Sequence, residues 1–96
     1  LLVDGALQLA DALAQFGRID VLVNNAAAPP GADRVPVVDL PEEAWDTVLD
    51  TNLKGTFLMS KAVARVMLRE GIRGRIVNIA SDRAKVGAAN LAAYCA

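Results

Sequence analysis

Residues 19–23 (IDVLV) place the strongest constraint on the fold, because they form a short, β-branched and almost wholly apolar run. A strand that is apolar on both faces suits the interior of a parallel sheet that helices cover on each side. A second run of this kind, residues 75–80 (RIVNIA), ends at Ser81. The two runs therefore predict two strands of one parallel sheet.

Three helices are predicted around these strands. Apolar residues recur at helical spacing over residues 3–16, and Gly17 ends the pattern as a C-cap. Pro41 suits the first position of a second helix, whose apolar residues lie on several sides, so that burial on more than one face is expected. A third helix is predicted to begin near residue 90 or 91. Residues 27–40 and 82–90 are predicted loops.

The order helix, strand, helix, strand, helix indicates right-handed βαβ units. We therefore predict an α/β fold with a doubly wound parallel sheet, of which residues 1–96 carry about two strands and three helices. The chain starts without a methionine and stops in a predicted helical turn. We expect it to be the central part of a single domain that continues at both ends.

Composition excludes several kinds of site. The 96 residues carry a net charge of −1, which gives no electrostatic footprint for nucleic acid or for an anionic membrane. No apolar run has the length of a membrane span. The chain has one cysteine and no histidine, so it can hold neither an internal disulfide nor a His-based zinc site, and we predict no metal. Acid–base chemistry must use Asp, Glu, Lys or Tyr.

Polar residues follow both predicted strands, with Asn24 and Asn25 after the first and Ser81 after the second. In open α/β sheets, ligands bind beyond the carboxyl ends of the strands, so these residues are candidates for a site. The alternative is structural, since Asn favours turns and Ser caps helices.

Asn52 and Tyr94 also have two interpretations. Asn52 falls on the apolar face of the second helix, where its amide either serves a site or holds a neighbouring loop. Tyr94 is the only tyrosine, and it is either a packing residue or an acid–base group. A free phenol has a pKa of about 10, so the second role needs a nearby cation that stabilises the phenolate.

Four motifs in order resemble the short-chain dehydrogenase/reductase family. Residues 24–27 (NNAA) follow a strand that residues 17–20 (GRID) introduce, and residues 52–55 (NLKG) lie on a helix. Residues 74–81 (GRIVNIAS) form the next strand, and Tyr94 comes 13 residues after Ser81. The resemblance covers essentially the whole chain, and it implies a Rossmann-like fold.

The resemblance also implies roles for individual residues. Tyr94 corresponds to the general acid/base, Ser81 to the hydroxyl that hydrogen-bonds the reacting oxygen, and Asn52 to the residue that holds a water of the proton relay. Asn25, Ala26 and Ala27 correspond to a segment beside the cofactor's adenine-side ribose. Ile79 would lie near the nicotinamide, with Tyr94 also beside the cofactor, and Asn24 is expected to be structural.

The chain departs from the family pattern in three respects. Ala27 stands where the family usually has Gly. The family's lysine belongs four residues after Tyr94, which is beyond Ala96, and the glycine-rich phosphate-binding turn is absent from the chain. We therefore expect the segment by itself to be inactive, and the choice between NAD and NADP stays open.

The function implied for the parent protein is that of an NAD(P)-dependent oxidoreductase, which moves a hydride between a nicotinamide cofactor and a carbonyl or secondary alcohol. A cytoplasmic homotetramer or homodimer is expected, paired partly through residues 54–69. One alternative is a non-catalytic binding or regulatory module of the same family. Another is a scaffold protein in which Asn52, Ser81 and Tyr94 only pack.

Overall fold

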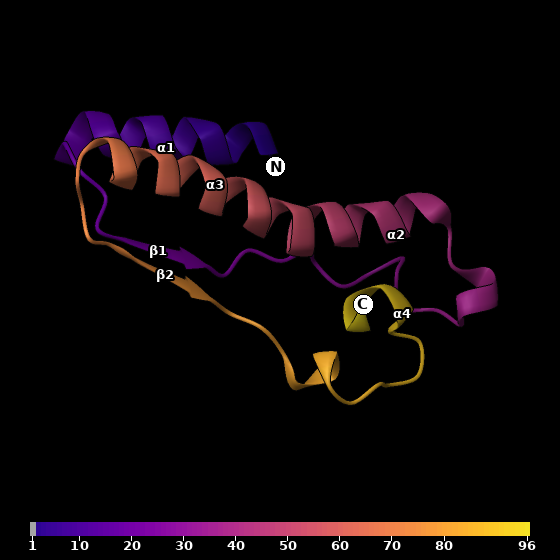
Figure 1. Cartoon of the computed structure of the whole chain (residues 1–96). Helices are drawn as coiled ribbons and strands as arrows, with labels where there is room; N and C mark the ends of the chain where they lie inside the picture. The colour runs from indigo at the N-terminus through magenta and orange to yellow at the C-terminus, as the bar shows by residue number, and fades with distance from the viewer. Residues whose placement is uncertain (1) are drawn as a thin grey trace. The chain divides into compact units, whose positions relative to one another are not determined.

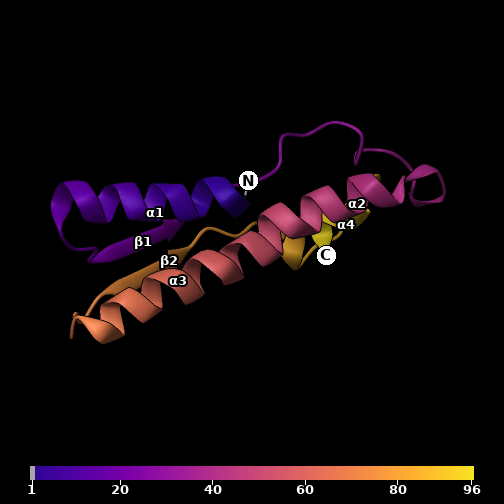
Figure 2. The ribbon, with the colours of Figure 1, turned by 90° about the horizontal axis from the view of Figure 1, so that it is seen from above.

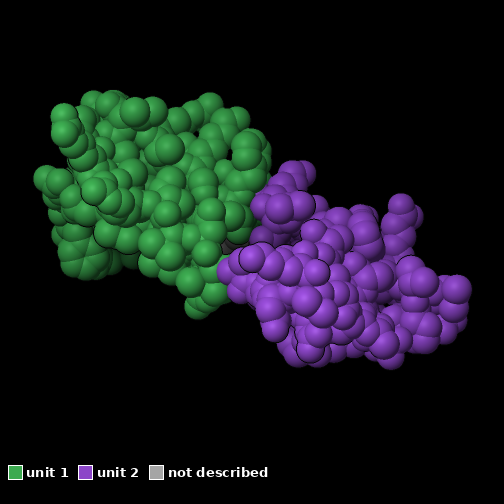
Figure 3. Space-filling view, turned by 60° about the horizontal axis from the view of Figure 1, so that its bottom comes forward, with its two compact units in different colours: residues 1–25, 55–79 green, residues 26–54, 80–96 purple. Residues whose placement is uncertain are grey.

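The computed structural model describes residues 2–96, with side chains from residue 5 onward. The chain forms two compact units, which Figure 3 shows in green and purple. The first unit contains residues 1–25 and 55–79, and the second contains residues 26–54 and 80–96. Each unit therefore combines two stretches that lie far apart in the sequence.

The first unit is a parallel pair of strands with two helices. β1 (Val21–Asn24) and β2 (Arg75–Asn78) pair in register from Val21 opposite Arg75 to Asn24 opposite Asn78. α1 (Leu2–Phe16) and α3 (Gly55–Arg69) lie on the same side of the strands in Figure 1, and the strands run between the two helices in the view of Figure 2. α3 contacts both α1 and β1. The parallel pairing predicted from the apolar runs is confirmed.

The core of this unit lies under α3, where Val63, Val66 and Met67 are buried. Along β1 the exposed and half-buried residues alternate, and Val21 and Val23 keep 55% and 54% of their surface exposed. The described residues of this unit therefore cover one face of the strands, whereas the apolar pattern predicts cover on both.

α1 ends as the sequence predicts. Gly17 has a φ of +78°, a backbone conformation that glycine adopts without a Cβ penalty, and its N–H donates to the carbonyl of Leu13 at 2.9 Å.

The second unit is built from helices and turns. α2 (Glu42–Leu49) is followed by a π-helical segment, η2 (Asp50–Lys54), and the short α4 (Ala92–Cys95) contacts α2. Two 3-10 turns complete it, η1 (Val37–Asp39) and η3 (Asp82–Ala84), and η3 contacts α4. Ala44 and Val48 of α2, Ala93 of α4 and Thr51 of η2 are its buried core residues.

The helix that the sequence predicts from Pro41 is present, with two differences in detail. Pro41 is the N-cap rather than the first helical residue, and the segment η2 interrupts the regular α-helical spacing. A π-helical segment shifts the side chains that follow it around the helix axis, and such segments occur often at functional sites. None of the helices in the described part of the chain has the length and apolar character needed to cross a membrane.

Candidate active site

Asn52 lies in the π-helical segment and fixes the loop that follows β1. Its Oδ1 accepts a hydrogen bond from the backbone N–H of Ala28 at 2.8 Å, and the side chain is half-buried. The loop-holding role that the sequence left open is therefore present in the structure.

Ser81 lies directly before η3 and caps it. Its Oγ accepts a hydrogen bond from the backbone N–H of Arg83 at 3.2 Å and donates to Oδ1 of Asp82 at 3.3 Å. The second distance is long for an O–H···O bond, whose usual range ends near ~3.0 Å. The hydroxyl is therefore oriented by the cap, while its own proton is only weakly held.

Tyr94 lies on α4, which the buried Ala93 anchors with 1% of its surface exposed. Tyr94 as a whole residue is 38% exposed, and its hydroxyl makes no hydrogen bond to any described residue. A hydroxyl in this state is accessible to a ligand. α4 starts after Asn90, whose φ of +61° is uncommon for a residue with a Cβ.

The three candidate catalytic residues belong to the same compact unit. η3, which Ser81 caps, contacts the helix that carries Tyr94, and that helix contacts α2, the helix that precedes the Asn52 segment. The hydroxyls of Ser81 and Tyr94 share no hydrogen bond within the described residues. The structure thus brings their supporting elements together without joining the side chains directly.

The predicted cofactor segments divide between the two units. Asn25 and Ile79 each follow a paired strand residue of the first unit, and the N–H of Ile79 donates to the carbonyl of Asn24 at 3.0 Å. Both side chains are exposed, and they stand at the carboxyl edge of the strands as predicted. Ala26 and Ala27 belong to the second unit and are also exposed.

Asn24 is structural, in agreement with its expected role. Its Nδ2 donates to Oγ of Ser60 at 3.0 Å and to Oδ1 of Asn78 at 2.9 Å. One amide group therefore joins β1 to β2 and to α3. No local pattern indicates Ser60 as a partner, because a serine within a helical pattern is ordinarily solvated.

Asp33 is a second residue that the sequence pattern did not single out. It lies in the predicted loop, yet only 7% of its surface is exposed, and its Oδ1 accepts a hydrogen bond from the N–H of Gly31 at 3.1 Å. Loops rich in Pro, Gly and Asp usually expose their carboxylates to water. The burial of the Asp33 carboxylate is therefore visible only in the three-dimensional structure.

The titratable groups with displaced pKa values lie away from these residues. The Arg18 guanidinium hydrogen-bonds the carboxylate of Asp20 and holds the pKa of that carboxyl below its ordinary value. Across the described part of the chain, no group of three or more Asp, Glu, Cys or His side chains could hold a metal ion.

The chain is similar to dehydrogenases over nearly its whole length. It is 49% identical to D-threitol dehydrogenase of Mycolicibacterium smegmatis over 88 residues, which cover 91% of this chain and 32% of that protein. It is 44% identical to galactitol 2-dehydrogenase of Agrobacterium fabrum over 82 residues, covering 85% of this chain and 31% of that protein. The chain also resembles the crystal structure of acetoin dehydrogenase from Enterobacter cloacae, with a TM-score of 0.83 and 38% sequence identity. The match covers 95% of this chain and 35% of the acetoin dehydrogenase chain.

The chain thus spans about a third of the length of these relatives. The fold is a Rossmann-type α/β fold, as the alternation of elements predicts. The model of the short chain dehydrogenase family matches residues 6–96, which is almost the entire sequence. The chain belongs to the short chain dehydrogenase family.

Proposed function

We propose that the protein carrying this chain is an NAD(P)-dependent oxidoreductase that interconverts a secondary alcohol and a carbonyl. The observation that carries the proposal is the grouping of Asn52, Ser81 and Tyr94 in one compact unit, where α4 contacts η3 and also α2, the helix that precedes the Asn52 segment. Family membership adds the expectation that these side chains act together. A catalyst of this kind needs its proton donor and its oxygen-binding hydroxyl near one small site.

In this proposal each side chain has a distinct role. The hydroxyl of Tyr94, to which no described residue hydrogen-bonds, donates a proton to the substrate oxygen during reduction, and its phenolate form accepts the proton of the alcohol during oxidation. The hydroxyl of Ser81, already oriented by the N–H of Arg83, donates to the same oxygen as negative charge develops on it. Asn52 keeps the loop at Ala28 in place, and the family resemblance assigns to it the ordered water of the proton relay.

The residues present are compatible with part of a dinucleotide site. Asn25 and Ile79 are exposed at the carboxyl ends of two parallel strands, and the small side chains of Ala26 and Ala27 leave the backbone open to close approach. When bound, a nicotinamide dinucleotide supplies the hydride acceptor or donor for the reaction. The choice between NAD and NADP is left open.

We further propose that the substrate is a small polyol or hydroxyketone. Support comes from the names of the relatives, which act on D-threitol, galactitol or acetoin. These compounds share short carbon chains with adjacent oxygen functions. A panel of such alcohols and ketones, assayed with NAD and NADP in both directions, tests this class directly.

The catalytic role of Tyr94 is tested by Tyr94→Phe in the intact protein. This variant removes the reactive proton and keeps the ring, so turnover should be lost while cofactor affinity, measured by fluorescence titration, stays near the wild-type value. Ser81→Ala should lower kcat by roughly 10²–10³-fold. Gln15→Ala, an exposed substitution on α1, should leave turnover unchanged. Near-normal turnover of Tyr94→Phe would refute the role.

A non-catalytic module of the same family is the second candidate. It is favoured by the structural duties of Asn52 and Ser81, which anchor a loop and cap a turn. Cofactor binding by the intact wild-type protein without turnover on any member of the panel would support this alternative.

We also propose that the intact protein is a cytoplasmic homo-oligomer. Support for pairing comes from the exposed apolar side chains of α3, with Phe57 and Leu68 exposed to 59% and 83%. Light scattering of the wild type and of Leu68→Lys would show whether a dimer or tetramer exists and depends on this helix. Cell fractionation tests the location.

A further inference from the structure

The loop after β1 and the helix α2 line an open cavity of about 290 Å³ within the second unit. Its apolar walls come from alanine, proline and valine side chains, among them Ala28, Pro41 and Val48. Two carboxylates also line it, those of Asp33 and Glu43. None of the predicted catalytic or cofactor residues lines this cavity.

The carboxylate of Asp33 is the unusual feature of the cavity. The residue is more than nine-tenths buried, and the N–H of Gly31 is the only described donor to it. Among the described residues, no fully buried side-chain oxygen lacks a hydrogen-bond partner. The second oxygen of Asp33, which has no such partner, must therefore keep accessible surface, and Asp33 is one of the residues that line the cavity. A buried carboxylate in this position favours a donor or a positive charge beside it.

The charges around the cavity are of one sign. Neither Asp33 nor Glu43 forms an ion pair with a described residue, and Arg34, the nearest basic residue in the sequence, is exposed and contacts neither of them through an ion pair. Both carboxylates carry a negative charge, which favours a positively charged ligand in the cavity over a neutral one. The described residues hold no group of three or more Asp, Glu, Cys or His side chains that could bind a metal ion, and the apolar walls of the cavity favour a cation with an alkyl chain.

We propose that this cavity binds a small aliphatic ammonium group. The ammonium nitrogen would lie against the free oxygen of Asp33, with Glu43 completing the negative environment, and the alkyl chain would contact the apolar walls. The volume lies near the lower end of the usual range for ligand pockets, roughly 300–1,000 Å³, which limits the ligand to a short chain. The site is independent of the residues assigned to hydride transfer.

Occupancy of the site would be reported by Ala28. This residue lines the cavity, and its N–H donates to Oδ1 of Asn52 at 2.8 Å. A ligand in the cavity therefore lies beside the residue that anchors the loop. The amide resonance of Ala28 is therefore a local probe of binding that does not depend on activity.

The test compares butylammonium with 1-butanol, a neutral molecule of similar shape, on the intact protein by NMR titration. Butylammonium should shift the amide resonances of Ala28, Ala32 and Ala44 saturably, and 1-butanol at equal concentration should not. Asp33→Asn keeps an acceptor for the Gly31 N–H and should weaken the binding by about tenfold or more. Glu43→Gln, at an exposed position, should weaken it to a smaller extent.

A matched control is Asp39→Asn, which removes an exposed carboxylate of the same loop that does not line the cavity. Its affinity for butylammonium should equal that of the wild type. Equal binding of 1-butanol and butylammonium would overturn the proposal, since it would show an apolar cavity without charge recognition. Absence of saturable shifts, or unchanged affinity in both Asp33→Asn and Glu43→Gln, would overturn it as well.

Discussion

The backbone N–H of Ala28 donates to Oδ1 of Asn52 across 24 residues of sequence, at 2.8 Å. This bond joins the loop after β1 to the π-helical segment, and both groups are partly buried. An amide oxygen on the inner face of a helix thus holds a loop in place. The family resemblance also assigns to Asn52 the role of holding a water of the proton relay.

The first prediction concerns the stability that this bond provides. Asn52→Ala removes the acceptor and leaves the Ala28 N–H unsatisfied, which should cost about 1–3 kcal/mol in the free energy of unfolding. Hydrogen exchange of the Ala28 amide should also become faster in Asn52→Ala, because this N–H has lost its acceptor. Asn52→Asp keeps the acceptor oxygen and should retain most of the protection at Ala28. Equal exchange rates in wild type and Asn52→Ala would contradict the anchoring role.

The second prediction concerns Asn24, whose Nδ2 serves two acceptors, Ser60 and Asn78. Asn24→Asp replaces the donor with a carboxylate oxygen that faces the amide oxygen of Asn78, while the Ser60 hydroxyl can still donate to it, so the variant should lose about 1–3 kcal/mol of unfolding free energy. Asn25→Asp, at the next and exposed position, is the matched control and should have little effect on stability. Equal melting temperatures of the two variants would show that the Asn24 amide contributes nothing.

Local patterns were sufficient to predict both strands and the main helices of this chain. Gly17 ends α1 where the helical spacing stops, and the two apolar runs become β1 and β2. Each of these predictions depends on neighbouring residues, whose propensities act over one or two turns. The family motifs likewise occupy short segments, which is why membership was evident from residues 24–27 and 74–81.

Features that depend on distant residues were not predictable in this way. The π-helical segment at Asp50–Lys54 leaves no mark in a periodic pattern, and the burial of Asp33 results from α2 lying beside a loop that otherwise has a solvated composition. The partner of Asn24 on α3 is 36 residues away. The roles of Asn52, Ser81 and Tyr94 in catalysis remain predictions, since their contacts in the structure are also those of structural residues.

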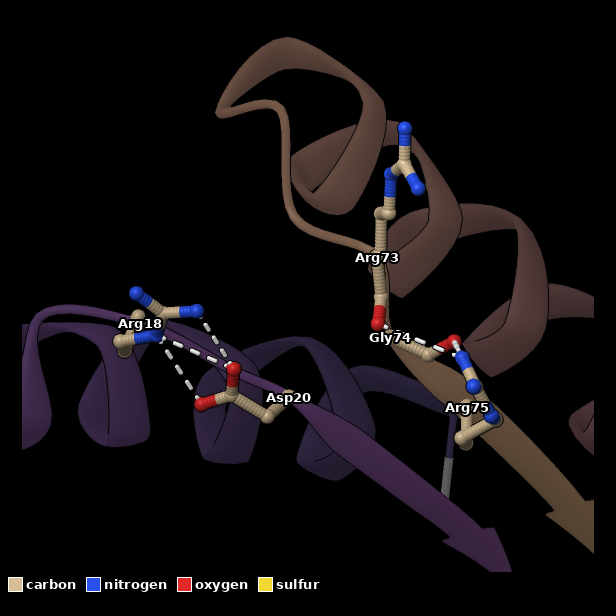
Figure 4. A network of polar contacts seen from close by, with 5 residues as sticks. All are labelled: Arg18, Asp20, Arg73, Gly74 and Arg75. Atoms are coloured by element: carbon tan, nitrogen blue, oxygen red, sulfur yellow. Dashed lines mark hydrogen bonds and ion pairs between the residues drawn. The ribbon is translucent and has the colours of Figure 1, made fainter.

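The third prediction concerns the ion pair of Arg18 and Asp20, which Figure 4 shows beside the start of β1. The hydrogen bonds from Arg18 lower the pKa of the Asp20 carboxyl, so its stabilising contribution is present above the unfolded-state pKa and is lost as the pH falls through the lowered value. An NMR titration should find the Asp20 pKa below its ordinary value in the wild type and close to it in Arg18→Gln.

Both side chains of this pair are more than half exposed, so the effect of Arg18→Gln on overall stability should be small. Arg75→Gln is a suitable control, since Arg75 bonds the carbonyls of Gly74 and Arg73 rather than a carboxylate (Figure 4). An unchanged Asp20 pKa in Arg18→Gln would mean that the ion pair does not form in solution.

The last prediction concerns Gly74, which lies where the chain enters β2. A Cβ at this position would come within 2.7 Å of the carbonyl oxygen of Asp20 and closer still to the side chain of Met67, which is buried. The Met67 side chain can move, but the Asp20 carbonyl is backbone and accepts the N–H of Arg75. Gly74→Ala should therefore destabilise the protein by about 1–3 kcal/mol in chemical denaturation. Gly87→Ala is the control and should leave the stability unchanged, since a Cβ at Gly87 would have no atom within 4 Å. Equal stability of the two variants would disprove the close contact at Gly74.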